Sequence, residues 1–363
     1  MAEIVLKGLG HSYQAEAKSD ADYALKPVNL TWEDGKTYAL LGPSGCGKTT
    51  MLNIISGLLS PSDGQLLFDG KDMTRASTAE RNIAQVFQFP VIYTTKSVRQ
   101  NLAFPLECRN WDAARIAKRV SHIAELLDLT DILGEPARRL SADQKQLISL
   151  GRGLVRDDVS AVLLDEPLTV IDPQMKFGLR RKLREINRAT GITMILVTHD
   201  QSEAMSFADE VVVMKDGRVQ QSGPPEQLFT RPQNEFVGYF IGSPPLNLLT
   251  AETSNGTLHC PALGLSVTMR GRGQDRGQDD GAKFGVRPEH VHLVEGRPEL
   301  PRAKVERVEN LGIERIFTLR TGTNETLKVK SRRHHSLRPG AETGLSVNDS
   351  DLLVFSDGQL VCR

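Results

Sequence analysis

Uninterrupted apolar runs recur along the first two thirds of the chain. Residues 38–41, 162–164 and 194–197 are apolar without strict alternation. Such runs are typical of strands in a mostly parallel sheet that is covered on both faces. Helical patterns separate them, so we expect an α/β domain over residues 1–240.

The pattern changes twice along the chain. Residues from about 90 to 155 predict a largely helical block that is inserted between strands of the sheet. Short β-prone segments, such as residues 303–308 and 327–330, follow after residue 245, with Gly- and Pro-containing turns between them. They predict an all-β barrel domain over residues 246–363. Within it, the glycines and alternating charges of residues 268–281 indicate a mobile surface loop.

Composition narrows the classes of protein that fit this pattern. The 363 residues contain 45 Lys and Arg against 45 Asp and Glu, so no global positive field is available to recruit nucleic acid. No apolar run reaches the roughly 18 residues that span a bilayer, and residues 1–7 do not resemble a secretory signal. Scattered cysteines without metal-binding spacing indicate reduced thiols in a cytoplasmic protein. They are Cys46, Cys108, Cys260 and Cys362.

A glycine-rich phosphate loop lies between a predicted strand and a predicted helix. Residues 42–50 read Gly-Pro-Ser-Gly-Cys-Gly-Lys-Thr-Thr, which lets backbone N–H groups turn inward around a phosphate at the helix N-terminus. Lys48 supplies a cation for the β- and γ-phosphates of ATP, and the Thr49 hydroxyl is a candidate Mg²⁺ ligand. The predicted nucleotide-binding residues of the loop are Gly42, Ser44, Gly45, Cys46, Gly47, Lys48, Thr49 and Thr50.

Two carboxylates end the apolar run at residues 162–164. Asp165 ends a predicted buried strand, from which its carboxylate can reach Mg²⁺. The adjacent Glu166 can polarise an attacking water. Phosphoryl transfer depends mainly on positioning and charge neutralisation, so loop and carboxylates together predict ATP hydrolysis.

In this order, the motifs resemble the ATP-binding cassette ATPases over about 240 residues. The resemblance implies that Gln88 contacts Mg²⁺ and reports to membrane subunits, and that Asp172 belongs to the loop following the catalytic strand. It also implies that Ser141 and Gln144 belong to the signature segment and that His199 contacts the γ-phosphate. The implied catalytic set is Glu166, His199, Lys48 and Gln88, and the implied metal ligands are Thr49, Gln88 and Asp165.

The adenine base has a candidate aromatic partner near the N-terminus. By the same resemblance, Tyr13 is expected to stack on adenine, and it joins Gln88, Ser141, Gln144, Asp165, Asp172 and His199 in the predicted nucleotide site. Residues 14–23 resemble an insertion, which makes Tyr23 a competing candidate.

A narrower resemblance concerns the type of transporter. Residues 101–106, 236–245 and 285–290 are similar to maltose and glycerol-3-phosphate importer ATPases, which carry a C-terminal regulatory domain of oligonucleotide-binding-like barrels. Residues 88–93 and 140–146 are similar to the paired ATPase subunits of bacterial glycerol importers. This implies a peripheral subunit at the cytoplasmic face of the cell membrane, with permease subunits as partners and a solute-binding protein as an indirect partner.

The signature segment departs from the family pattern Leu-Ser-Gly-Gly-Gln. Ala142 and Asp143 replace both glycines, which adds a Cβ and a negative charge where a phosphate should approach. Either the variant works in a homodimer, or the chain pairs with a different ATPase subunit, and we favour the heterodimer.

The expected function is the ATPase subunit of a bacterial importer for a polyol or sugar-like solute, with glycerol as the first candidate. Another carbohydrate or sn-glycerol-3-phosphate is the alternative within that class. Outside it, the alternatives are a soluble cassette ATPase without a transport role and a regulatory binder that senses a metabolite or protein through its barrels.

Overall fold

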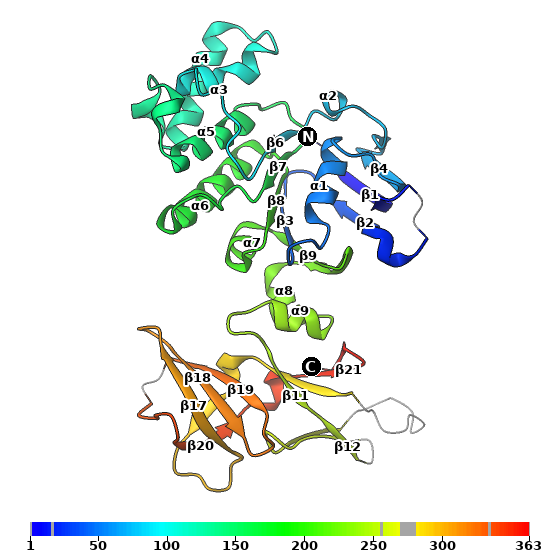
Figure 1. Cartoon of the computed structure of the whole chain (residues 1–363), viewed down its shortest axis with the longest axis vertical. Coiled ribbons are helices and arrows are strands. Elements are labelled where there is room, and N and C mark those ends of the chain that lie inside the picture. The colour runs from blue at the N-terminus through cyan, green and yellow to red at the C-terminus, as the bar shows by residue number, and fades with distance from the viewer. Residues whose placement is uncertain (1, 16–17, 255–256, 269–280, 333–334, 363) are drawn as a thin grey trace. The chain divides into compact units, whose positions relative to one another are not determined.

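The computed structural model describes residues 2–15, 18–254, 257–268, 281–332 and 335–362 (Figure 1). Most of the predicted surface loop at residues 268–281 lies outside this range. The chain forms two compact units, Met1–Pro225 and Glu226–Arg363. No helix among the described residues combines the length and apolar character needed to cross a bilayer.

A central sheet organises the first unit. Its strands are β3 (Thr37–Leu41), β6 (Ala84–Val86), β7 (Val162–Asp165), β8 (Met194–Thr198), β9 (Glu210–Lys215) and β10 (Arg218–Gly223). The order is β10-β9-β3-β8-β7-β6, with parallel pairing except between β9 and β10. All residues of β3 and β8 are buried. The predicted parallel α/β sheet is therefore confirmed.

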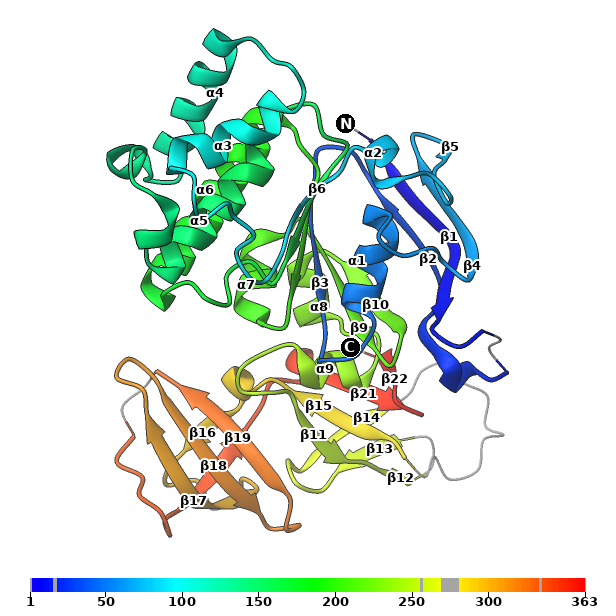
Figure 2. The same ribbon diagram turned by 45° about the horizontal axis from the view of Figure 1, so that its top comes forward.

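A second, antiparallel sheet covers one side of the first unit. It has the order β2-β1-β4-β5, with β1 (Ile4–Ser12), β2 (Tyr23–Trp32), β4 (Asp63–Phe68) and β5 (Lys71–Asp72). Helix α1 (Lys48–Ser56) lies between this sheet and the central one (Figure 2). Leu52 of α1 shares one buried apolar cluster with Leu6 of β1 and Leu163 of β7. This core fixes the position of the helix that follows the phosphate loop.

Helices make up most of the block predicted at residues 90–155. They are α3 (Val98–Glu107), α4 (Ala113–Leu126) and α5 (Ala142–Leu154), with the 3-10 turns η2 (Thr130–Ile132) and η3 (Ala137–Arg139). Helix α5 packs on both α3 and α4. The other helical elements of this unit are η1 (Asp20–Asp22), α2 (Thr78–Arg81), α6 (Pro173–Thr190) and α7 (Gln201–Phe207).

The second unit is built from antiparallel sheets, which confirms its all-β class. The strand orders are β11-β15-β21-β22, β12-β13-β14 and β16-β20-β17-β18-β19. The bounds are β11 (Asn247–Thr250), β12 (Glu252–Ser254), β13 (Thr257–Cys260), β14 (Leu265–Thr268), β15 (Lys283–Val286), β16 (His292–Val294), β17 (Arg302–Asn310), β18 (Arg315–Thr321), β19 (Thr326–Ser331), β20 (Glu342–Ser346), β21 (Leu352–Ser356) and β22 (Gln359–Cys362). The 3-10 turns η4 (Pro288–His290) and η5 (Asp349–Asp351) join them.

The second unit begins earlier than the border expected at residues 240–246. Helices α8 (Pro225–Thr230) and α9 (Glu235–Phe240) are held to its sheets by a buried arginine. The Arg287 guanidinium donates to the backbone carbonyls of Phe229 at 2.7 Å, Gly238 at 2.9 Å and Ile241. Burial lowers the pKa of Arg287 to about 10. Because a buried cation needs these acceptors, the helices belong to the second unit.

Candidate nucleotide-binding and catalytic site

The carboxyl ends of β3, β6, β7 and β8, which are labelled in Figure 1, lie at one edge of the central sheet because these strands pair in parallel. The phosphate loop follows β3, Gln88 follows β6, Asp165 ends β7 and His199 follows β8. Ligands of open parallel α/β sheets bind at this edge. The fold thus gathers motifs that are more than 150 residues apart in the sequence.

Two glycines of the phosphate loop are required by the backbone. Gly47 has a φ of 99°, and a Cβ there would lie 2.6 Å from the carbonyl oxygen of Ala24. A Cβ on Gly42 would lie 2.3 Å from the carbonyl oxygen of Met214 and 2.7 Å from Cys46 Sγ. Side chains at these positions would displace the loop. The loop therefore has the close-approach geometry that a phosphate cradle needs.

Lys48 is buried at the start of α1, and its ammonium group lies within the loop. The Lys48 Nζ donates to the carbonyl oxygens of Gly42 at 2.8 Å and Pro43 at 2.9 Å. Burial raises the pKa of the neighbouring Cys46 thiol, although the Lys48 charge opposes the shift. The thiol therefore stays protonated near neutral pH, as expected for a reduced cysteine that fills space in the loop.

The rim of the loop is open to solvent. Ser44, Gly45 and Thr49 are exposed, and Gly45 has a φ of 78°. Thr50, the next residue along the chain, is buried, and its Oγ1 lies 3.2 Å from the Tyr13 hydroxyl. The hydroxyl and backbone groups of this rim are available to phosphate oxygens.

The two candidate adenine-stacking tyrosines differ in their contacts. Tyr13 is 67% exposed and meets the ring of His11 edge-on, with 4.7 Å between ring centroids. Tyr23 donates a 2.8 Å hydrogen bond to Asp63. The open ring beside the phosphate loop favours Tyr13, whereas Tyr23 is tied to β4.

Glu166 lies at the centre of a polar cluster. One carboxylate oxygen lies 3.2 Å from Nδ1 of His199, and the other accepts from the Gln88 amide at 3.3 Å and the Thr169 hydroxyl at 3.4 Å. The backbone of Glu166 has a φ of 45°, a conformation that costs free energy in a residue with a side chain. This strained turn directs the carboxylate toward residues that follow β6 and β8.

Asp165 is a partly buried carboxylate beside a second carboxylate. Burial raises its pKa, the Glu166 carboxylate raises it further, and Lys48 opposes the shift. Within the described residues, no group of three or more His, Cys, Asp or Glu side chains is arranged to hold a metal. Mg²⁺ is commonly bound by one carboxylate together with substrate phosphates. The oxygen donors of Asp165, Thr49 and Gln88 fit that requirement.

The signature segment forms the N-terminus of α5. Ser141 is the N-cap, and its Oγ accepts from the Gln144 backbone N–H at 3.3 Å, while Gln144 Oε1 accepts from the Ser141 N–H at 3.1 Å. Asp143 is half-buried in the first helical turn. In the described parts of the chain, Ser141 and Gln144 bond to each other and not to the phosphate loop or the Glu166 carboxylate. These two predicted residues therefore take no part in the hydrogen bonds around Glu166.

Asp172 also caps a helix. Its side chain accepts from the Gln174 N–H at 2.8 Å at the start of α6. The structure places this predicted site residue outside the hydrogen bonds around Glu166. Its local role is to end the loop that carries Thr169.

Two residues at this edge were missed by the sequence analysis. Thr169 bonds to Glu166, and a hydroxyl three residues after a catalytic carboxylate was the available signal. Gln146 is fully buried and donates to the carbonyls of Phe87 at 3.2 Å and Pro167 at 3.0 Å. A glutamine on the buried face of a helix is a recognisable signal of such a bridge. It joins α5 to the residues next to Gln88 and next to Glu166.

Comparisons with known proteins agree with this architecture. The family model described as ABC transporter matches residues 25–169, and the TOBE domain model matches residues 284–355. The chain is 40% identical to the trehalose import ATP-binding protein SugC of Mycobacterium tuberculosis strain H37Rv, over 88% of this chain and 82% of that protein. It is 38% identical to the trehalose/maltose import ATP-binding protein MalK of Thermococcus litoralis, over 92% and 93% respectively.

Two further similarities extend over different lengths. The chain is 33% identical to the sn-glycerol-3-phosphate import ATP-binding protein UgpC of Cupriavidus pinatubonensis, over 99% of this chain and 98% of that protein. The solved structure of cbiO1 from Clostridium perfringens, part of the ABC transporter complex cbiONQ, is 30% identical with a TM-score of 0.57, and the match covers 63% of this chain and 90% of that one. The chain therefore belongs to the family of ABC import ATP-binding proteins, which are ATPases coupled to transport.

Proposed function

We propose that this ATPase powers import of a polyol or sugar-like solute, with glycerol as the first candidate. The observation that carries the catalytic part is the cluster of Gln88, Thr169 and His199 around Glu166, beside a phosphate loop. The solute class is supported by the import proteins for trehalose, maltose and sn-glycerol-3-phosphate, which match at 33–40% identity. The motifs at residues 88–93 and 140–146 support glycerol within that class.

In the proposed mechanism, Glu166 is the general base. Its carboxylate takes a proton from water as the water attacks the terminal phosphorus, and the bond from that phosphorus to the bridging oxygen breaks to release ADP. Gln88 and Thr169 hold the carboxylate in place. His199 orients the same carboxylate through Nδ1 and, being 58% exposed, presents its other ring nitrogen to the γ-phosphate. Lys48 exchanges its bonds to the loop carbonyls for bonds to phosphate oxygens. Bound Mg²⁺ would neutralise phosphate charge, held by Thr49, Asp165 and Gln88.

We propose further that the chain works in a heterodimer with a different ATPase subunit. In such a pair, this chain would supply an intact phosphate loop and Glu166 to one site, completed by the signature segment of the partner. Ala142 and Asp143 would face the second, weaker site. An asymmetric pair explains why the hydrolytic residues are complete while both signature glycines are replaced.

Docking on the permease subunits is assigned to the helical block near residues 90–110. Its border exposes apolar side chains, with Phe89 70% and Val91 55% exposed. Exposed apolar side chains that lie close together are typical of a protein–protein interface. The ATPase would thus be a peripheral subunit at the cytoplasmic face of the cell membrane, and the solute-binding protein would be an indirect partner.

Purification from native membranes through a tag on this chain tests the proposal. Mass spectrometry should identify two permease subunits and a second, different ATPase subunit. Recovery of this ATPase alone with permeases would replace the heterodimer by a homodimer. Recovery without any membrane subunit would favour a soluble cassette ATPase and overturn the transport role.

A further inference from the structure

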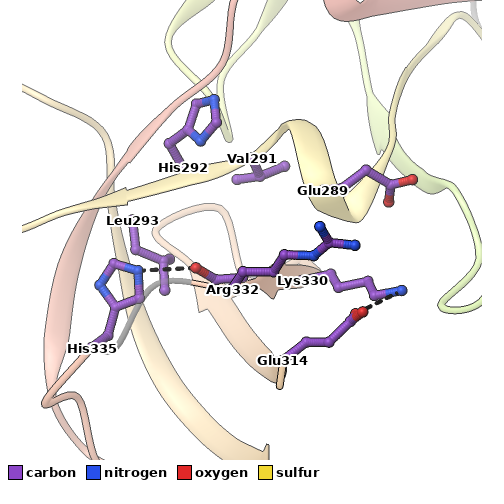
Figure 3. Close-up of a pocket in the computed structure, with 9 residues that line it drawn as sticks. Glu289, Val291, His292, Leu293, Glu314, Lys330, Arg332 and His335 are labelled. Atoms are coloured by element: carbon purple, nitrogen blue, oxygen red, sulfur yellow. Dashed lines mark hydrogen bonds and ion pairs between the residues drawn. The ribbon is translucent and has the colours of Figure 1, made fainter. Parts of the chain in front are cut away.

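The second unit contains a cavity of about 410 Å³ that ATP hydrolysis does not use (Figure 3). It lies among η4, β16 and β19, at the end of one antiparallel sheet. Cavities that bind small molecules usually begin at about this size. Its charged and polar lining includes Glu289, His292, Glu314, Lys330, Arg332 and His335.

Some of these groups are already paired with each other. Lys330 Nζ lies 2.8 Å from the Glu314 carboxylate, and His335 Nε2 lies 3.2 Å from the Ser331 hydroxyl (Figure 3). The ring of His335 also packs edge-on against Phe317, with 5.8 Å between centroids. These contacts fix the orientation of the wall before any ligand binds, which lowers the entropic cost of binding.

The remaining charged groups point into solvent-accessible space. Glu289 of η4 and Arg332, which directly follows β19, are exposed, and both project along the cavity in Figure 3. Lys330 and Arg332 balance the carboxylates of Glu289 and Glu314 in formal charge. The cavity therefore offers hydrogen-bond donors and acceptors in similar number. Its lining has no net formal charge that would favour an anion or a cation.

Apolar side chains form the floor of the cavity. Val291 is 2% and Leu293 8% exposed, and both contribute to the lining from the strand side. A ligand with carbon–hydrogen faces and hydroxyl edges matches this combination. Its hydroxyl groups can donate to the Glu289 carboxylate, which only accepts, and can accept from the Arg332 guanidinium, which only donates. A phosphate would instead face two carboxylates, with Lys330 already neutralised by Glu314.

We propose that this cavity binds a small polyhydroxylated molecule, a polyol or a small sugar. The choice of ligand class rests partly on the proposed import of such solutes. Binding requires no second chain and no nucleotide, because every group that contacts the ligand belongs to one sheet and its connections. The import ATPase would then carry its own site for the class of solute that the transporter delivers.

Direct titration of the full-length protein tests this site. Glycerol, maltose and trehalose are each titrated in calorimetry and in saturation-transfer NMR, which avoid the general stabilising effect of polyols on thermal unfolding. We expect saturable binding of at least one of them. Glu289→Gln and Arg332→Gln should each weaken it about tenfold, since each removes a charged hydrogen-bonding partner.

Matched variants separate the cavity from the rest of the surface. Glu299→Gln and Lys304→Gln change exposed residues that do not line the cavity, and they should leave the affinity unchanged. Circular dichroism and ATP hydrolysis should be the same for all four variants. Equal loss of binding in the control variants would overturn the assignment.

Two further outcomes are decisive. Binding of inorganic phosphate or sn-glycerol-3-phosphate without binding of any neutral compound would make this an anion site and overturn the proposal. Absence of any binding would also overturn it. Co-purification with permeases is measured separately. A chain that joins permeases but binds no polyol defeats the cavity proposal alone, and one that binds polyol without permeases defeats the transport proposal alone.

Discussion

The phosphate loop and the signature segment both precede a helix, but only the helix after the signature segment is capped by side chains. At α1, the N-cap is Gly47 with a φ of 99°, and no side chain caps the first turn. At α5, Ser141 and Gln144 cap each other, and Asp143 adds a carboxylate. Uncapped N–H groups attract phosphate, whereas the capping box of α5 already satisfies the N–H groups of Ser141 and Gln144 and the Asp143 carboxylate repels an anion.

This comparison explains how one chain can keep an intact phosphate loop and still tolerate a signature segment that has lost both glycines. Capping stabilises α5 by about 1 kcal/mol, and α5 packs on α3 and α4. The structural role of the signature segment is therefore preserved even though the glycines are lost. The phosphate loop has no such substitute, because Gly42 and Gly47 lie against backbone atoms.

The largest expected effect concerns the general base. Glu166→Gln keeps the hydrogen-bonding shape of the side chain but cannot take a proton, so ATP hydrolysis should fall at least about 100-fold while ATP binding remains. Phosphate release and retention of radiolabelled nucleotide measure the two properties. The exposed Glu125→Gln on α4 is the control and should hydrolyse ATP normally. Wild-type turnover by Glu166→Gln would assign the base to another residue.

The next largest effect is expected at Gly47, the N-cap of α1. Gly47→Ala places a Cβ against the Ala24 carbonyl at a left-handed backbone position. We expect a strain of about 2 kcal/mol, which corresponds to an ATP affinity about 30-fold lower. Fluorescent nucleotide titration measures it. Gly134→Ala is the matched control, because its Cβ meets nothing within 4 Å.

If the two glycine variants bound ATP equally well, the backbone geometry of the loop would not determine phosphate binding. The difference in phosphate binding between the N-termini of α1 and α5 would then be due to the Asp143 charge alone.

A smaller effect is expected at the capped terminus. Asp143→Gly removes the carboxylate that would face the γ-phosphate of a second copy, so hydrolysis by the purified homodimer should rise about tenfold. Steady-state phosphate release measures it. Asp143→Asn separates charge from backbone freedom, because it removes the charge and keeps the Cβ. An unchanged rate in both variants would mean that Asp143 points away from the phosphate or that the homodimer is not the working unit.

Sequence patterns predicted the first unit well because its signals are local. Unbroken apolar runs identified β3, β7 and β8, and the glycine spacing identified the loop before α1. Since parallel strands end at one edge, the residues that follow β7 and β8 lie near each other. Family resemblance, rather than periodicity, supplied Gln88, His199 and Tyr13.

What could not be predicted depends on contacts between distant segments. The border of the second unit is set by the three carbonyls that Arg287, which directly follows β15, reaches. The cavity of the second unit combines Glu289 with Arg332 across different elements. No periodicity in either segment records such a contact, because each residue is an ordinary charged position in its own stretch of sequence.

The smallest effect tests a residue that sequence patterns did not single out. Thr169→Val removes the hydroxyl that donates to Glu166 at 3.4 Å and preserves the side-chain shape. One such bond contributes about 1 kcal/mol, so kcat should fall about fivefold with an unchanged KM for ATP. Steady-state kinetics of the two variants Thr169→Val and Thr169→Ser measure this split.

Thr169→Ser retains the donor and should restore the rate, which a purely structural role in the loop would not require. A KM that rises with the loss of kcat would place Thr169 in nucleotide binding instead of in positioning the base. Because the hydroxyl acts only through the Glu166 carboxylate, Thr169→Val should have no further effect in a Glu166→Gln background. Additive losses in the double variant would show that the two side chains act independently, and the cluster around Glu166 would then extend no further than Gln88 and His199.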